Sequence, residues 1–196
     1  MKQLNVEEFA AKYAIKVLHA QEVNQLSMMI FDEVCKKIRE LTEVERKYLQ
    51  AAALLHDIGY FVSAEKHNKH SLRMILDEGI SGFTTDEIKI IGCICRYHRG
   101  SLPDKTRHEI YKDLEKKQRK TVKRLGGILK LADGFVRGDK HQIKDIKLEY
   151  NAVDNIVKII LTPLECGLPD IDCAIRKRDL FEVGFKCQSV ILVAHE

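Results

Sequence analysis

Histidine and aspartate residues stand at several places where helical periodicity calls for apolar side chains. His19 heads a stripe of apolar residues at steps of three and four, His98 closes another, and Asp133 shares a face with apolar neighbours. The pair His56 and Asp57 ends a segment of alanine and leucine. Taken singly, each would be a hydrogen-bonded structural residue, a cap or an ion-pair partner. Together they are several buried polar groups that each need a partner, and one divalent cation with imidazole and carboxylate ligands would provide it for all of them.

The elements that must position these groups are helices. Apolar spacing predicts helices over residues 17–34, 43–58, about 70–78, 85–98 and 113–137, each carrying or adjoining a candidate ligand. Thr84 and Glu87 form a capping box that marks the start of the fourth helix. Adjacent His56 and Asp57 would point about 100° apart on an ideal helix. Both can therefore reach one ion only near the end of that helix, and Gly59 just downstream is consistent with such an end.

The pattern changes after residue 140. Alternating apolar residues predict strands over 143–150 and 155–162 joined by a hairpin turn, then a helix over 172–185 and a strand over 189–194. The expected fold is therefore mainly α, with a helical domain over residues 1–140 and a small C-terminal β-β-α-β appendage over 141–196. The last strand could also pair with another chain at a sheet edge, so a homodimer is left open.

Composition limits the class of protein. The chain has 196 residues, of which 45% are hydrophobic and 32% charged, with a formal net charge of +4, as in ordinary globular domains. No segment resembles a secretory signal, and no run approaches the roughly 20 apolar residues of a membrane helix. Six cysteines without a CxxC pair indicate free thiols in the reducing cytoplasm. No nucleic-acid-binding motif is present, so nucleic acid is not an expected partner.

The order of the candidate ligands on helices resembles the HD superfamily of metal-dependent phosphohydrolases. The segments AAALLHDIGY, around the His-Asp pair, and LKLADG, around the last aspartate, carry this resemblance. More narrowly, HAQEVNQLSMMIFDEV, AAALLHDIGYFVSAEKHNKHS, IIGCICRYHRGSLP and KLADGFVR are similar to the C-terminal region of the exopolyphosphatase / guanosine pentaphosphatase family. The likeness covers most of residues 10–165 and implies an HD-domain helical bundle.

The resemblance implies a set of ligands for a divalent metal: His19, His56, Asp57 and Asp133. Some HD proteins hold a second ion through two more histidines, and His70 and His98 occupy comparable places here. His67 is less favoured, since we expect it in the loop before its helix, and Asn68 stands where relatives commonly have another histidine. Mixed histidine and aspartate ligation suits Mn, Fe, Zn, Co or Ni better than Mg, for one ion or two.

The implied activity is hydrolysis of a phosphomonoester, nucleotide or phosphoanhydride by metal-activated water, with His56 and Asp57 in catalytic positions. Lys66, Lys69 and Arg99 lie beside the candidate ligands and could pair with substrate phosphates, although solvated loop charge explains them equally well. The expected partner is a small phosphorylated molecule, a nucleotide or polyphosphate. The same ligands would also permit oxidation chemistry at two irons, which nothing adjacent favours.

A non-catalytic module that binds a nucleotide or polyphosphate is the alternative. The basic stretch at residues 116–124 supports it, although such a stretch is often only the solvated face of a helix. In the full-length family, exopolyphosphatase activity is attributed to actin-like N-terminal domains, whereas the HD-like region here starts almost at Met1. We therefore expect the helical fold and the association with phosphorylated compounds to carry over, and not the exopolyphosphatase activity.

Overall fold

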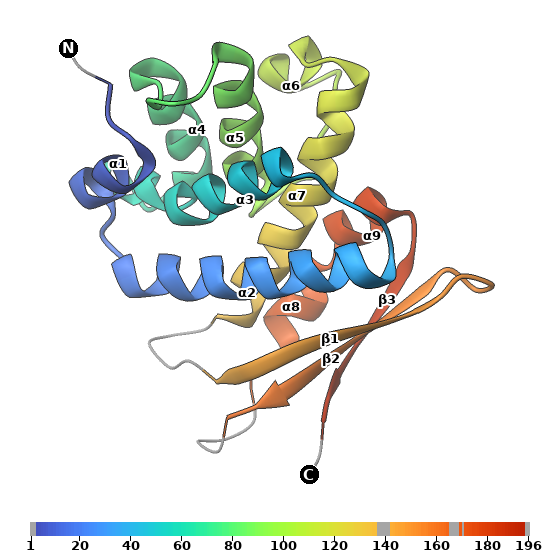
Figure 1. Cartoon of the computed structure of the whole chain (residues 1–196). Coiled ribbons are helices and arrows are strands. Elements are labelled where there is room, and N and C mark those ends of the chain that lie inside the picture. The colour runs from blue at the N-terminus through green and yellow to red at the C-terminus, as the bar shows by residue number, and fades with distance from the viewer. Residues whose placement is uncertain (1–2, 137–141, 165–168, 170, 195–196) are drawn as a thin grey trace.

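The computed structural model describes residues 3–136, 142–164, 169 and 171–194. Helices dominate this part of the chain, and a small sheet follows near its end (Figure 1). The helices before the sheet are α1 (Val6–Tyr13), α2 (Val17–Lys37), α3 (Glu43–Leu55), the 3-10 helix η1 (Ile58–Phe61), α4 (His67–Glu78), α5 (Thr85–Tyr97), α6 (Glu109–Asp113) and α7 (Lys116–Phe135). After them come β1 (Ile143–Asn151), β2 (Ile156–Pro163), α8 (Asp172–Lys177), α9 (Asp179–Phe185) and β3 (Gln188–Val193). The expectation of a mainly helical protein with a β-β-α-β tail is confirmed.

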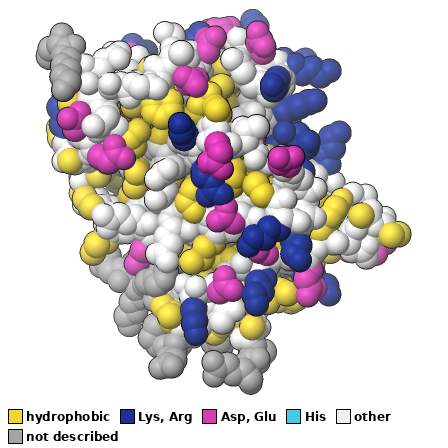
Figure 2. Space-filling view, in the orientation of Figure 1, with side chains coloured by type: hydrophobic (Ala, Val, Ile, Leu, Met, Phe, Trp, Pro, Cys, Tyr) yellow, Lys and Arg dark blue, Asp and Glu magenta, His cyan; other side chains and the backbone are white. Residues whose placement is uncertain are grey.

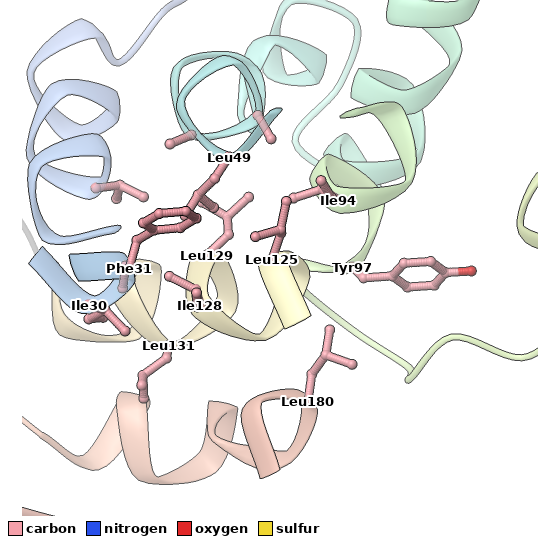
Figure 3. Close-up of a cluster of buried hydrophobic side chains, with 14 of the residues drawn as sticks. Ile30, Phe31, Leu49, Ile94, Tyr97, Leu125, Ile128, Leu129, Leu131 and Leu180 are labelled. Carbon is pink, nitrogen blue, oxygen red and sulfur yellow. The ribbon is translucent and has the colours of Figure 1, made fainter. Parts of the chain in front are cut away.

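The long helix α7 lies at the centre of the fold, where α2, α3, α5, α8 and α9 pack against it. On one side, Leu125 and Leu129 meet Phe31 of α2, Leu49 of α3 and Ile94 of α5, and all five side chains are fully buried (Figure 3). These apolar stripes are the ones that the sequence periodicity predicted. Because helices α2, α3, α5 and α7 share this core, their ends are held in fixed relation to one another.

The tail packs on the opposite side of α7 at two glycines. A side chain on Gly127 would place a Cβ 2.7 Å from the Phe181 backbone of α9, and one on Gly134 would lie 2.7 Å from the Ala174 Cα of α8. Only glycine allows backbones to approach this closely. The boundary that we predicted at residue 140 remains a prediction, but apolar side chains from both sides of it belong to one continuous core.

The sheet has the order β1-β2-β3, with β1 and β2 antiparallel and β3 parallel to β2. Leu148 pairs with Ile159, which in turn pairs with Ile191, and all three side chains are buried. The sheet is tied to the bundle where the Leu148 amide donates a hydrogen bond to Glu33 of α2, at 3.0 Å. The three strands lie within two residues of their predicted bounds.

Several predicted helix bounds were wrong. Helix α4 begins at His67, three residues earlier than expected, after Lys66 takes a left-handed conformation with φ of 56°. The helix predicted over 113–137 is α7, which begins at Lys116 because Leu114 is extended, and the short helix α6 before it was not predicted. The helix predicted over 172–185 is α8 followed by α9. Helix α1 was not predicted, although Asn5 and Glu8 form its capping box.

The described residues contain no helix that is both long enough and apolar enough to cross a membrane. Five of the six cysteines lie among the described residues, and all five carry free thiols; Cys166 lies outside them. Free thiols agree with the expectation from their spacing.

Candidate metal centre

Helix ends bring the candidate ligands together. His19 lies in the first turn of α2, and His56 and Asp57 follow the last residue of α3. His98 is the C-terminal cap of α5, and Asp133 lies in the last turn of α7. These five residues, which the sequence singled out from four separate helices, therefore converge on one place in the folded chain.

Asp57 lies at the centre of this cluster. Its Oδ1 atom is 3.3 Å from His67 Nε2, 3.6 Å from His98 Nε2 and 3.6 Å from His56 Nε2. Its Oδ2 atom faces the other way and lies 3.8 Å from His19 Nε2. The two oxygens of one carboxylate thus face two different sets of imidazoles.

Asp133 completes one of these sets. Its Oδ1 atom is 3.1 Å from His19 Nε2 and 3.9 Å from His56 Nε2. In two groups of three residues, the ligand atoms lie within 4.8 Å of one another: His19, His56 and Asp133 form the first, and His56, Asp57 and His98 the second. His56 belongs to both, so the arrangement has room for one shared ion or for two neighbouring ions.

Backbone carbonyls fix the tautomers of three of the histidines. The Nδ1 atoms of His56, His67 and His98 lie 2.8, 3.1 and 2.6 Å from the carbonyl oxygens three residues before them. A carbonyl oxygen only accepts, so each Nδ1 carries the hydrogen and donates it. In the neutral ring, each Nε2 then carries an unprotonated lone pair directed at the cluster, which is the form in which imidazole binds a metal.

In this tautomer, these lone pairs have no hydrogen-bond donor among the described residues. His56 Nε2 is buried and has no hydrogen-bond partner among the described residues. His67 Nε2 and His98 Nε2 face each other at 3.2 Å, although both are acceptors in this tautomer. Buried acceptors that point at one another need a cation or a proton between them. The residues therefore fit a bound divalent cation, which His/Asp donor sets take readily.

Electrostatics keeps the carboxylates charged and at least one imidazole neutral. Burial raises the pKa of Asp57, but the surrounding histidines outweigh it and hold that pKa well below its usual range. Burial also opposes ionisation of Asp133, and His19 together with Lys177 brings its pKa well below the usual value. Burial lowers the pKa of His98 to about 3, so His98 is neutral at physiological pH. Ionised carboxylate and neutral imidazole are the metal-binding forms.

Lys177 of α8 was not among the predicted site residues. Its ammonium group forms an ion pair with Asp133 Oδ2, on the opposite side of that carboxylate from His19. Both side chains are mostly buried, with 19% of Lys177 and 11% of Asp133 exposed. The tail of the chain thus contributes directly to the cluster, and no local sequence pattern indicated it.

His70 lies outside the cluster, and His67 lies within it. His70 is half-buried on α4 and has no hydrogen bond, ion pair or ring contact with the described cluster residues. His67 was expected in a loop, and that location was wrong, since it is the first residue of α4. Its buried ring stacks on Tyr60, with centroids 4.1 Å apart, and places Nε2 against Asp57.

The predicted phosphate-binding residues border a neighbouring pocket. Lys66, Lys69 and Arg99 line a cavity of about 390 Å³ between the start of α4 and the end of α5. His67 lines the same cavity, so the pocket and the His-Asp cluster adjoin. Asn68 joins the two helices at this point, because its amide donates hydrogen bonds to the carbonyls of Arg96 and Arg99 at 2.7 and 3.0 Å.

Histidines and aspartates at the converging ends of a helical bundle define an HD-like domain. The family description Ppx/GppA phosphatase, domain III, matches residues 1–165, and the chain belongs to this family. A guanosine-5'-triphosphate,3'-diphosphate pyrophosphatase from Pseudoalteromonas translucida (strain TAC 125) is 26% identical over 104 residues, which are 52% of this chain. The match covers only 20% of that relative, so the chain spans about a fifth of its length. Lys177 lies beyond the matched residues of the family.

Proposed function

We propose that this chain is a metal-dependent phosphohydrolase that cleaves a phosphomonoester, a nucleotide or a phosphoanhydride with a water molecule. The observation that carries the proposal is the set of Nε2 atoms of His56, His67 and His98 directed at the carboxylate of Asp57, while each Nδ1 donates to a backbone carbonyl. Membership of a phosphatase family supports the same reaction class.

The proposed metal ligands fall into two sets around Asp57. His19, His56 and Asp133 would hold one ion, and His56, Asp57 and His98 would hold a second. His67, whose Nε2 lies 3.3 Å from Asp57 Oδ1, would add a ligand to the second ion. Mixed imidazole and carboxylate donors favour Mn, Fe, Zn, Co or Ni over Mg. A divalent ion bound there would make water nucleophilic near neutral pH and stabilise charge on the phosphoryl oxygens.

The chain's own side chains then position water and substrate. Asp57 is ionised and presents oxygens to both sides of the cluster, so it can accept a hydrogen bond from the attacking water and orient it. The predicted catalytic role of His56 would be to hold the ion that both ligand sets share. Lys66, Lys69 and Arg99 would pair with phosphate oxygens from the adjoining pocket.

The second candidate function is a binding module without catalysis. Lys177 pairs with the Asp133 oxygen that faces away from His19, and this ion pair offsets part of the negative charge that a cation would need, which favours a cluster with weak affinity for metal. Lys and Arg side chains also gather over α6 and the N-terminal half of α7, where residues 116–124 lie (Figure 2). Such a surface suits a polyanion such as polyphosphate.

Metal content and hydrolysis should be measured together to test these functions. The wild type, the double variant His56→Ala plus Asp57→Ala, and the control His70→Ala would be assayed for bound metal. Each would then be tested on phosphomonoesters, nucleotides and polyphosphate with added Mn²⁺. We expect metal and hydrolysis in the wild type and the control, and neither in the double variant.

Two other outcomes separate the alternatives. A wild type that binds metal and hydrolyses none of these compounds would establish the binding module in place of the enzyme. A folded wild type with no metal affinity would overturn both the metal centre and the phosphohydrolase.

A further inference from the structure

The pocket beside the cluster has an excess of positive charge. Four of its described lining residues are cationic, namely Lys66, Lys69, Arg96 and Arg99. Glu65 is the one carboxylate in that lining, and its Oε1 atom already pairs with Lys66 Nζ at 2.9 Å. Three cations of the pocket are therefore left without a neutralising carboxylate in its wall.

Arg96 differs from the other three because it is buried. Only 8% of its surface is exposed, whereas Lys66, Lys69 and Arg99 are exposed. Its side chain donates no hydrogen bond and forms no ion pair within the described part of the chain. Its guanidinium carbon lies 5.6 Å from the centroid of the Tyr97 ring. A guanidinium on such a largely buried side chain is poorly hydrated, and leaving it without a counter-ion is unfavourable in a folded protein. Such a group is typical of a site that receives its anion from outside.

Two further features of the pocket favour an anion. The first residues of α4 line it, so the positive end of a helix of 12 residues contributes to its field. The same field reaches His108, whose pKa is lowered first by burial and then by the charge of Arg96. Lys69 acts on His108 in the same direction. Asp104 acts on His108 in the opposite direction, and the positive field of the cavity itself comes from its lysine and arginine side chains and from the start of α4.

We propose that this pocket binds a phosphate group of the substrate other than the one that is hydrolysed, and that Arg96 is the residue that recognises it. The choice of phosphate rests on the proposed function. His67 connects the two sites, since it lines the pocket while its Nε2 atom faces Asp57. The expected substrate therefore carries at least two phosphate groups, and the guanidinium of Arg96 donates two parallel hydrogen bonds to oxygens of the second phosphate.

Binding of pyrophosphate to metal-free protein tests this pocket without any hydrolysis. Calorimetric titration would compare the wild type with Arg96→Met, which keeps the apolar stem and removes the charge. The control is Arg73→Met, an exposed arginine on α4 that pairs with Asp77 outside the pocket. We expect Arg96→Met to weaken binding by roughly ten- to a hundredfold, as for the loss of a charged hydrogen-bonded contact. The control should bind as the wild type does.

Thermal unfolding gives a second readout that a structural arginine would not give. Because Arg96 lacks a counter-ion, Arg96→Met without pyrophosphate should melt at the same temperature as the wild type or higher. Pyrophosphate should raise the melting temperature of the wild type and not that of the variant. A lower melting temperature for the variant with unchanged pyrophosphate affinity would overturn the proposal.

Two further arms make the test decisive. If Arg96→Met does not fold, Arg96→Lys keeps the charge without the fork and should still weaken binding; affinity equal to the wild type would refute the proposal. Inorganic phosphate should bind more weakly than pyrophosphate, and equal affinity would reduce the pocket to a site for free phosphate. Because these titrations need no metal, Arg96-dependent binding in a protein that hydrolyses nothing would reject the proposed function and retain the pocket.

Discussion

Replacing Lys177 by methionine should separate the stability of the metal-free protein from its affinity for metal. Methionine keeps much of the stem and removes the ammonium group that pairs with Asp133. Asp133 would then stay buried with His19 at 3.1 Å as its remaining close partner. The exposures of 19% and 11% place this pair between a surface ion pair and a fully buried one.

The size of the effect follows from that position. Exposed pairs contribute up to about 1 kcal/mol, and breaking a fully buried pair costs about 3–5 kcal/mol, so we expect a loss of about 2–3 kcal/mol. For a chain of this length, that loss lowers the melting temperature by about 4–12 °C. In the wild type, a metal ion that binds Asp133 must compete with the Lys177 ammonium for the charge of that carboxylate. The variant lacks this competitor. Metal binding to the variant should therefore tighten, with an upper limit of about 30- to 150-fold.

Scanning calorimetry of metal-free protein and titration with Mn²⁺ would measure the two effects. Arg176→Met is the matched control, because Arg176 is an exposed neighbour on the same helix. The control should change neither quantity. If Lys177→Met melted like the wild type and bound Mn²⁺ with the same affinity, the ammonium would not engage Asp133 in solution and the reasoning would fail.

Two further predictions concern the cluster itself. His67→Ala should lower the number of bound metal ions or their affinity, whereas His70→Ala should change neither, because of these two residues His67 alone faces Asp57. Elemental analysis of both variants measures the metal content, and equal losses would contradict the assignment. The metal-free protein should also lose stability as the pH falls from 7 to 5. His98 has a pKa of about 3 in the folded protein and about 6.5 in the unfolded chain. Below about pH 6.5 the unfolded chain therefore binds a proton that the folded protein does not bind, and the free energy of unfolding falls by up to about 1.4 kcal/mol per pH unit. Below about pH 4, the lowered pKa of Asp57 adds to the loss, since its stabilising contribution is present only above the unfolded value. Urea unfolding at each pH measures this, and a flat profile between pH 7 and 5 would be the contrary result.

The spacing of apolar residues was sufficient to identify those cluster residues that lie on amphipathic helices. His19 and Asp133 interrupt apolar stripes of α2 and α7, and each stripe faces the shared core. His56 and Asp57 could be placed at a helix end because adjacent side chains point about 100° apart on a helix and can reach a single ion only near its end. The core, most helices and the three strands follow from the same patterns.

The remaining site residues depend on features that periodicity does not encode. His67 starts a helix whose preceding residue, Lys66, provides no side-chain cap, so no capping pattern marks that start. Arg96 lies on α5, where Cys95 and Tyr97 on either side of it are buried too, so no polar face could be distinguished. Lys177 reaches the cluster through the packing of α8 against Gly134, a tertiary contact between distant segments. Each of these required the folded chain.

The partner of Asp133 also sets an order of events during synthesis. All the histidines and aspartates of the cluster lie between residues 19 and 133, whereas Lys177 follows Asp133 after a separation of 44 residues. Because a nascent chain emerges from its N-terminus, the ligands are available to a cation before α8 has been made. If the proposed metal centre forms, a cation could therefore reach Asp133 before the lysine that pairs with it in the folded chain has been synthesised.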